Sequence, residues 1–298
     1  MANFPKEKAG KAEAQGRAGV PGIGMSMPDL TDAEFNQLSQ LVYQHAGINL
    51  PIQKKELVRS RLTKILRTRG LRSFQDYYHQ VLQDNSGLEL TNLLDAISTN
   101  QTAFWREPKH FEFLGQELIP ALQKKGTGPP RWRIWSAGCS SGEEPYTLAM
   151  VILSSSTHKD LSGVKIVATD INTQVLNQAQ RGVYPMSRVE PLTMEWRRRF
   201  FQKGVSQWEG YVRVKPEVKQ LVDFSQLNLM APFPFKEEFD IIFCRNVMIY
   251  FEKATQTEVV NKFHRCLKPG GHLFIGHSES LCNINHHFSY VKPTIYRK

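Results

Sequence analysis

The sequence contains few cysteines, and they are widely spaced. No two have the Cys-x-x-Cys spacing, and the four are Cys139, Cys244, Cys266 and Cys282. Zinc sites and redox motifs use such close spacing, and disulfide frameworks are dense in small secreted domains. We therefore predict reduced thiols in a cytoplasmic protein. The nine histidines show no ligand spacing either, so we expect no metal site.

Long hydrophobic runs are absent as well. No segment approaches the roughly 20 apolar residues that a membrane-spanning helix requires. The apolar stretch 241–251 is interrupted by Arg245 and Asn246. Residues 1–28 carry scattered charges among Gly, Ala and Pro, without the apolar core of a signal peptide. We expect these residues to form a disordered tail, and we expect no membrane insertion.

Acidic residues are outnumbered, with 28 Asp and Glu against 38 Lys and Arg, and the net charge is +10. This charge favours an anionic partner, which could be nucleic acid, a membrane surface or an acidic protein. Between residues 53 and 73, eight basic residues accompany a single acidic residue, Glu56. Apolar residues recur there at helical spacing, while Arg59, Lys64 and Arg67 lie away from them. The segment predicts an amphipathic helix with a basic outer face, although such a run is also typical of an ordinary solvated face.

The first part of the chain reads as an all-helical domain over residues 29–125. Apolar residues at helical spacing predict helices in five segments, at 31–46, 53–70, 74–84, 86–98 and 107–125. A loop rich in Gly and Pro follows at 124–130, which indicates a boundary between domains.

Residues 126–298 alternate between strand and helix patterns. Strands are predicted at 132–137, 164–169, 221–224, 239–244, 273–276 and 289–296, and helices at 143–154, 173–180 and 255–267. This alternation predicts an α/β domain with a parallel sheet covered by helices on both faces. Residues 195–220 break the pattern and predict a small antiparallel insert.

Two strand ends suggest the kind of ligand. The first strand runs into a loop of small residues that contains Gly138 and Gly142, and the second ends at Asp170. An acid at this position commonly binds ribose hydroxyls. A dinucleotide fingerprint needs G-x-G-x-x-G, whereas Glu143 and Glu144 here would repel a pyrophosphate. The loop therefore favours S-adenosylmethionine (SAM) over NAD, in a Rossmann-like SAM-dependent methyltransferase domain.

Five ordered motifs extend this interpretation. They are Ser98–Glu107 (STNQTAFWRE), Trp135–Tyr146 (WSAGCSSGEEPY), Ala168–Asn172 (ATDIN) with Asn228-Leu229, Phe239–Phe251 (FDIIFCRNVMIYF) and Gly276–Glu279 (GHSE). In these motifs the chain resembles the CheR family, the chemotaxis receptor glutamate O-methyltransferases, over about residues 29–298.

The resemblance implies a SAM-binding domain with a small antiparallel insert, preceded by a helical domain. It implies methyl transfer from SAM to receptor glutamates, giving a glutamate methyl ester and S-adenosylhomocysteine. The residues that match the family's cofactor contacts are Asn100, Thr102, Arg106, Glu144, Asp170, Asn228, Leu229, Arg245 and Asn246. Arg106 and Tyr250 match positions beside the transferred methyl group.

The resemblance also implies a partner. The basic helix matches the element that faces the acidic helical cytoplasmic region of chemoreceptors, with Arg59, Arg61, Lys64 and Arg67 as substrate-binding residues. The insert could dock the receptor's C-terminal peptide, although the loop Gly204–Gly210 has fewer glycines than the family pattern. We expect a monomer that binds no nucleic acid.

The proposed chemistry needs little from the protein. A glutamate carboxylate has a pKa of about 4.3 and is already ionised at neutral pH, so neither a general base nor a metal is required. The enzyme must align oxygen, methyl and sulfur. Arg106 can orient a carboxylate of substrate or cofactor through its planar fork, and Tyr250 can donate a hydrogen bond. We expect Asp170 to bind the ribose diol and Glu144 to balance the cofactor's positive groups.

Other interpretations remain open at this point. Arg106 could pair with Glu107 or Glu112 on the surface, Asp170 could only cap a helix, and Tyr250 could be a core aromatic. A nucleic-acid methyltransferase would fit the basic charge, but the strand end at 244–247 lacks the N/D-P-P-Y/F tetrapeptide. A silent module that binds SAM without turnover is the other alternative.

Overall fold

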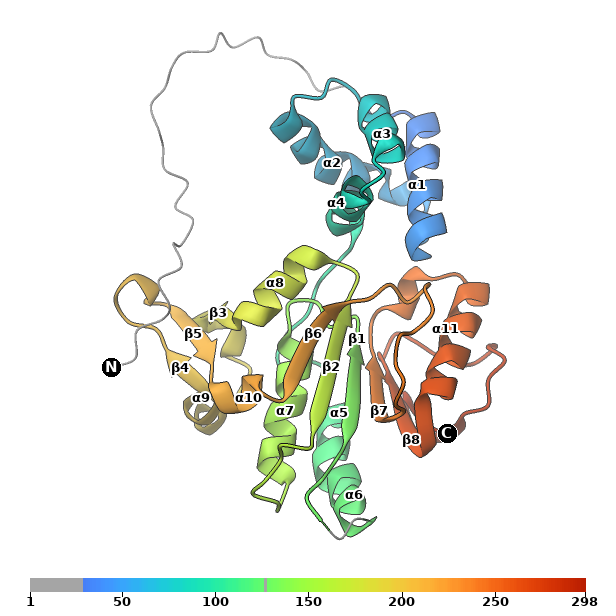
Figure 1. The fold of residues 1–298 in the computed structure, drawn as a ribbon. Helices are drawn as coiled ribbons and strands as arrows, with labels where there is room; N and C mark the ends of the chain where they lie inside the picture. Colours follow the sequence, from blue (N-terminus) through green and yellow to red (C-terminus); the bar gives the residue numbers. More distant parts are fainter. Residues whose placement is uncertain (1–28, 126–127) are drawn as a thin grey trace.

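The structure is a computed structural model that describes residues 29–125 and 128–298, so the tail predicted at 1–28 lies outside the described residues. A helical bundle lies over one edge of an α/β domain (Figure 1). The predicted fold class is confirmed. Within the described ranges, no helix is long and apolar enough to cross a membrane.

The bundle consists of helices α1 (Asp32–Ala46), α2 (Lys55–Arg69), α3 (Phe74–Gln83) and α4 (Leu88–Ile97). Helix α1 begins with a capping box, in which Thr31 and Glu34 satisfy each other's backbone amides, and ends at Gly47 in the left-handed conformation. Helix α2 follows the 3₁₀ helix η1 (Ile52–Lys54) and ends at Gly70, also left-handed. The apolar faces of all four helices form one core.

The α/β domain contains a seven-stranded sheet in the order β6-β2-β1-β7-β8-β10-β9. Its first five strands are parallel, and β10 is antiparallel to both of its neighbours. The bounds are β1 (Arg133–Ala137), β2 (Lys165–Asp170), β6 (Val222–Gln226), β7 (Phe239–Cys244), β8 (Leu267–Ile275), β9 (Ser289–Lys292) and β10 (Ile295–Arg297).

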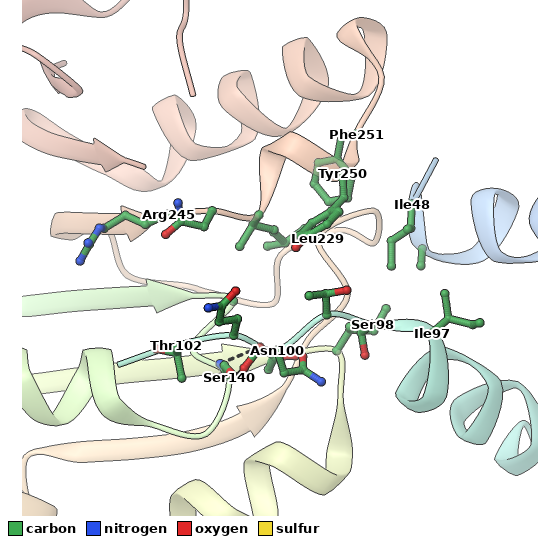
Figure 2. A pocket seen from close by; sticks show the side chains of 18 of the residues that line it. Ile48, Ile97, Ser98, Asn100, Thr102, Ser140, Leu229, Arg245, Tyr250 and Phe251 are labelled. Carbon is green, nitrogen blue, oxygen red and sulfur yellow. Dashed lines mark hydrogen bonds between the residues drawn. The ribbon is translucent and has the colours of Figure 1, made fainter. Parts of the chain in front are cut away.

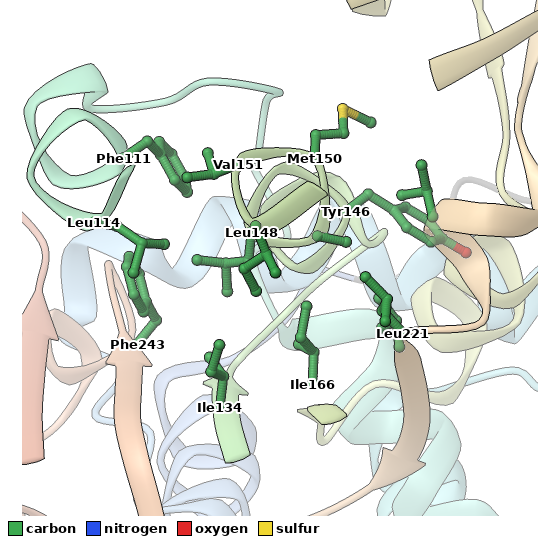
Figure 3. Packing of buried hydrophobic residues seen from close by; sticks show 14 of the residues in the cluster. Phe111, Leu114, Ile134, Tyr146, Leu148, Met150, Val151, Ile166, Leu221 and Phe243 are labelled. Carbon is green, nitrogen blue, oxygen red and sulfur yellow. The ribbon is translucent and has the colours of Figure 1, made fainter. Parts of the chain in front are cut away.

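Helices cover both faces of this sheet, as predicted. The bounds are α5 (Pro108–Phe113), the π-helix η2 (Leu114–Leu118), α6 (Ile119–Lys125), α7 (Glu143–Ser155), α8 (Thr173–Arg181) and α11 (Lys253–Cys266). Ile134 of β1 packs with Phe111 and Leu148 on one face (Figure 3). The next residue, Trp135, points to the other face and packs against Phe263 of α11.

The structure differs from our boundaries in three places. The buried residues of α5, η2 and α6 belong to the sheet core and not to the bundle core, so the packing divides the chain near residue 100 and not near 125. The small antiparallel sheet has the order β3-β5-β4 and begins at Val183, before the predicted start at 195. The predicted last strand is a hairpin that turns at Thr294, which has a φ of 62°.

The small sheet has its own helices around it. Its strands are β3 (Val183–Pro185), β4 (Phe201–Lys203) and β5 (Tyr211–Val214), and the associated helices are η3 (Met186–Val189), α9 (Met194–Phe200), η4 (Ser206–Trp208) and α10 (Pro216–Lys219). Phe104, which precedes α5, contacts both Tyr184 and Phe201 edge to face. The insert is therefore packed against the segment that leads from the bundle to the sheet.

Candidate functional site

The main pocket opens at the carboxyl ends of the parallel strands. Strand β1 lies between β2 and β7, so the order in which the strands are added to the sheet reverses there, and crevices at such switch points bind ligands in α/β proteins. The pocket is lined by residues that follow β1, β2, β6 and β7, by the segment 97–106, and by bundle residues from α1 to α2. Its space, including the open mouth, is about 1130 Å³. Figure 2 shows Tyr250 and Leu229 on the opposite wall from Asn100 and Ser98.

The loop after β1 holds Asp170 in place. The Ser140 amide donates to Asp170 Oδ2 at 2.8 Å, and the Asn172 amide donates to Oδ1 at 2.9 Å. Each oxygen keeps a further lone pair for a ligand such as a diol. Burial raises the pKa of Asp170, although these backbone amides oppose the shift. Gly138 lets this loop pack against Val247, since a Cβ atom at position 138 would lie 2.3 Å from Val247 Cγ2.

Arg106 lies on a strained segment that lines the pocket. Its neighbours Trp105 and Glu107 have φ values of 60° and 58°, a region that L-residues rarely adopt. The Arg106 guanidinium donates to the Gln101 carbonyl at 2.7 Å and forms no ion pair among the described residues. The surface pairing with Glu107 or Glu112 is therefore not present, and most of the fork remains available to a ligand.

The segment before Arg106 is fixed through its backbone. Ser140 Oγ donates to the Asn100 carbonyl at 2.8 Å (Figure 2), and Arg188 donates to the Thr102 carbonyl at 2.9 Å. Both Asn100 and Thr102 line the pocket.

Arg245 lines the pocket and lies in a buried ion-pair network. Its guanidinium is 3.0 Å from Glu107 and 3.3 Å from Glu144, and it also donates to the Arg106 carbonyl at 2.5 Å. Burial raises the pKa of Glu144, and Arg245 opposes this shift. Burial acts in the same direction on Glu107, but Arg245 and the His277 amide outweigh it and lower the pKa. Glu144 and Arg245 thus balance each other at the pocket edge.

The same network contains the one group within residues 29–125 and 128–298 that has metal-ligand spacing: Glu107, His110 and His277. His110 Nε2 and Thr294 Oγ1 share a hydrogen bond of 2.6 Å, and His110 Nδ1 lies 3.5 Å from Glu107 Oε2. Burial lowers the pKa of His110 to about 3, which keeps the ring neutral. Because Arg245 contacts the Glu107 carboxylate at 3.0 Å, its guanidinium already supplies the positive charge there.

Tyr250 ends the 3₁₀ helix η5 (Met248–Tyr250), which follows β7. Its side chain lines the pocket, and none of the described residues forms a hydrogen bond with its hydroxyl group. The Lys54 ammonium lies 5.2 Å from the centre of the ring, and the Asn49 amide donates to the Tyr250 carbonyl at 2.8 Å. The bundle therefore holds Tyr250 from the side facing α1 and α2.

Asn228 and Leu229 follow β6 and also line the pocket. Asn228 Nδ2 donates to the His45 carbonyl of α1 at 2.5 Å, and its Oδ1 accepts from the Met230 amide at 2.9 Å. The Asn228 amide thus links the bundle to the sheet, and Leu229 supplies apolar wall.

The four predicted substrate-binding residues of α2 are not equivalent. Arg61 donates to the carbonyls of Ile97 and Ser98, so it ties α2 to the end of α4. Arg59 is paired with Asp29 and Glu56. Lys64 and Arg67 are exposed and form no ion pair within the described part of the chain.

Two important residues escaped the sequence reasoning. The sequence shows Lys54 only as part of a basic run, whereas in the structure it reaches the pocket beside Tyr250. Glu279 belongs to the quoted GHSE motif, yet no role was assigned to it. Its carboxylate is buried and accepts from five backbone amides.

The fold and the pocket define a class of protein. The sheet is parallel from β6 to β8, and the antiparallel strand β10 is inserted between β8 and β9. The carboxylates of Glu144 and Asp170 line the pocket beside the loop after β1, which suits a cationic cofactor without phosphate. These features are those of a SAM-dependent methyltransferase.

Comparisons with known proteins identify the family. Residues 33–98 match the model described as CheR methyltransferase, all-alpha domain, and residues 100–297 match that of the CheR methyltransferase, SAM binding domain. The chain therefore belongs to the CheR methyltransferase family, as its motifs predicted, and SAM is the methyl donor.

Several relatives match over nearly their whole length. The chain is 41% identical over 274 residues to the chemotaxis protein methyltransferase of Borreliella burgdorferi, covering 91% of this chain and 95% of that protein. It is 40% identical over 273 residues to the chemotaxis protein methyltransferase of Escherichia coli, covering 90% and 91%. It is also 40% identical over 267 residues to chemotaxis protein methyltransferase 2 of Pseudomonas aeruginosa, covering 89% and 93%.

Proposed function

We propose that the protein methylates glutamate side chains in the acidic cytoplasmic helices of a chemotaxis receptor. The products are the glutamate methyl ester and S-adenosylhomocysteine, and the protein acts in the cytoplasm as a monomer. The observation that carries the proposal is the state of Arg106, which lines the pocket while most of its guanidinium has no hydrogen-bond partner among the described residues. The family membership and the names of the relatives support the same reaction.

We assign the cofactor to the inner part of the pocket. Asp170 has acceptor capacity for the ribose hydroxyls, and the loop 138–140 packs directly against Val247 because Gly138 has no side chain. The backbone of Asn100 and Thr102, the apolar surface of Leu229 and the paired charges of Glu144 and Arg245 border the same space. Asn246 completes this wall.

SAM supplies a methyl group on a sulfonium, so transfer needs only the sulfur–carbon bond to break as a carbon–oxygen bond forms. The carboxylate oxygen attacks carbon, the electron pair of the broken bond stays on sulfur, and no proton moves. Arg106 orients the incoming carboxylate, and the Tyr250 hydroxyl donates a hydrogen bond near the reacting atoms. Catalysis then comes from positioning, which can lower the activation free energy by several kcal/mol.

The receptor approaches over the bundle side of the pocket. Lys64 and Arg67 are exposed on α2, and Lys54 from the same region reaches the pocket wall. This arrangement provides positive charge from the outer face of α2 to the mouth, which suits an acidic helical substrate. Docking of a receptor C-terminal peptide on the β3-β5-β4 sheet is a further possibility within this proposal.

The test is transfer of labelled methyl from SAM to receptor cytoplasmic fragments, followed by mild base. We expect base-labile label that is lost in Arg106→Ala and in Asp170→Ala. The matched control is Arg72→Ala, which removes a basic residue that does not line the pocket. Base-stable label would reject carboxyl methylation, and SAM binding without any transfer would favour a silent binding module.

A further inference from the structure

The turn from β7 into η5 is organised around one buried carboxylate. Glu279 is 8% exposed, and its Oε1 accepts from the amides of Val247 at 2.9 Å and Met248 at 2.7 Å. Ile249 adds a longer bond to the same oxygen at 3.3 Å. The second oxygen, Oε2, accepts from the Asn246 amide at 3.0 Å. Four consecutive amides thus point at a residue 30 to 33 positions later in the chain.

Two other features of this turn suit the same arrangement. Asn246 has a φ of 59°, which is strained for a residue with a side chain. Gly276 donates to Glu279 Oε2, and a Cβ atom at Gly276 would lie 2.6 Å from Asn246 Nδ2 and 2.8 Å from its backbone nitrogen. The end of β8 can therefore approach the turn only because position 276 is glycine.

Burying a carboxylate beneath this turn costs free energy. No cation pairs with Glu279 within 4.0 Å among the described residues, so its charge is balanced by amide dipoles alone. Burying a charge without a partner costs several kcal/mol unless hydrogen bonds compensate. Both oxygens must accept, which a glutamine cannot do, since its amide nitrogen is only a donor. The carboxylate is therefore retained only because these backbone amides compensate it.

Tyr250 directly follows this turn. The Tyr250 amide donates to the Val247 carbonyl at 3.1 Å. Val247, whose own amide is bonded to Glu279, therefore also holds the backbone of Tyr250. Glu279 does not line the pocket. Any effect on the reaction must therefore pass through the turn.

We propose that Glu279 is a positioning residue for methyl transfer, whose carboxylate holds the turn 246–249 so that the Tyr250 hydroxyl faces the reacting atoms. The inference rests on the proposed function. It predicts that loss of the carboxylate lowers kcat more than it weakens SAM binding. Asp170 and the loop after β1 are held by other bonds, and of the cofactor wall only Asn246 is bonded to Glu279.

The experiment compares Glu279→Gln, Tyr250→Phe and the double variant. The control is Glu217→Gln, the same chemical change at an exposed position of α10. We expect Glu279→Gln to lower kcat by about 100-fold, the size of effect that a misplaced catalytic group produces. The SAM Kd should stay within about threefold. Because Glu279 acts through Tyr250, the double variant should be no slower than Tyr250→Phe alone.

A second measurement does not depend on activity. Hydrogen exchange at the amides of residues 246–249 should become at least about tenfold faster in Glu279→Gln, with the sheet core unchanged. Additive losses in the double variant, unchanged exchange, or a SAM Kd that rises as kcat falls would overturn the inference. If Glu279→Gln does not fold, Glu279→Asp keeps the charge one methylene shorter and should show the same kcat loss to a smaller degree.

The two measurements separate this inference from the proposed function. If the wild-type protein transfers no methyl to receptor fragments, the proposed function fails. Faster exchange confined to residues 246–249 would then still show that Glu279 holds the turn, and unchanged exchange would reject that role.

Discussion

Arg106 lies between two residues whose backbone is strained, and the network behind it explains how that strain persists. Arg245 holds the Arg106 carbonyl, while Glu107 is held by Arg245 and by the His277 amide. The Arg106 side chain needs only one bond, to Gln101, to keep its direction. The buried charges therefore orient the backbone, and the free fork is left for the ligand.

Replacement of Arg106 by lysine should reveal which carboxylate it orients. Lysine keeps the charge but lacks the planar fork, so we expect kcat/KM for a receptor fragment to fall about 10- to 100-fold. If the SAM Kd rises by the same factor, Arg106 binds the cofactor carboxylate; if it does not, Arg106 binds the substrate glutamate. The control is Arg188→Lys, since Arg188 makes one hydrogen bond to the Thr102 carbonyl and an ion pair with Glu143 at 3.7 Å, and a lysine can form both kinds of contact. An unchanged kcat/KM would remove Arg106 from the mechanism.

His110 should make the stability of the protein depend on pH. Its pKa is about 3 in the folded protein against an ordinary value of 6.5, so between these values only the unfolded chain binds the proton. The free energy of unfolding should then fall as pH falls from 6.5 towards 3, with a contribution of up to about 1.4 kcal/mol per pH unit.

The measurement is urea unfolding at several pH values for the wild type and for His110→Phe. The variant cannot take up this proton, so the difference between the two slopes isolates His110 from the carboxylates that also titrate. Parallel curves between pH 6.5 and 4 would contradict the assignment.

At the scale of elements, helix α2 has two different basic surfaces. Arg61 serves the junction with α4, whereas Lys64 and Arg67 face solvent. A basic run in sequence therefore mixes structural and exposed charges. Only the exposed pair is available to attract an acidic partner.

Reversal of this exposed pair, Lys64→Glu with Arg67→Glu, should raise KM for an acidic receptor fragment about tenfold at low salt. The effect should shrink at higher ionic strength because exposed charges are screened. Neither kcat nor the SAM Kd should change. Lys159→Glu with Arg265→Glu gives the same change in net charge at exposed positions outside α2 and should leave KM unaffected. Equal effects of the two double variants would mean that net charge, and not α2, attracts the substrate.

At the scale of the whole molecule, the pocket is complete only when the bundle and the sheet are together. Asp95 of α4 accepts from the Thr173 amide at 2.9 Å and hydroxyl at 2.7 Å, and Asn228 donates to α1. Ile48 and Phe251 form an antiparallel bridge beside Tyr250. A ligand in this pocket contacts both units, so its binding should couple them.

Saturating S-adenosylhomocysteine should therefore protect the bundle as well as the sheet. At about 100 times its Kd, we expect the free energy of unfolding to rise by about 2.7 kcal/mol. Hydrogen exchange in α1 and α4 should slow together with exchange in β1 and β2. Protection confined to the sheet would show that the bundle is not part of the binding site.

The sequence by itself determined the order and type of most of the longer helices and strands. Periodicity and turn residues are local signals, so helix α2 with its terminal Gly70, and β1 with its small-residue loop, could be read directly. The same local reasoning placed Asp170 at a strand end and favoured SAM. Ordered motifs gave the family, which the comparisons confirm, while the roles of individual site residues stay predictions.

Only the tertiary structure decided which distant residues meet. A helical pattern in α5 and α6 shows an apolar face but not what covers it, which is why our boundary at 125 lay beyond the observed division. The network of Arg245 joins residues about 100 positions or more apart, and Glu279 reaches back more than 30. Such contacts depend on how the strands are ordered in the sheet, and no local periodicity encodes that order.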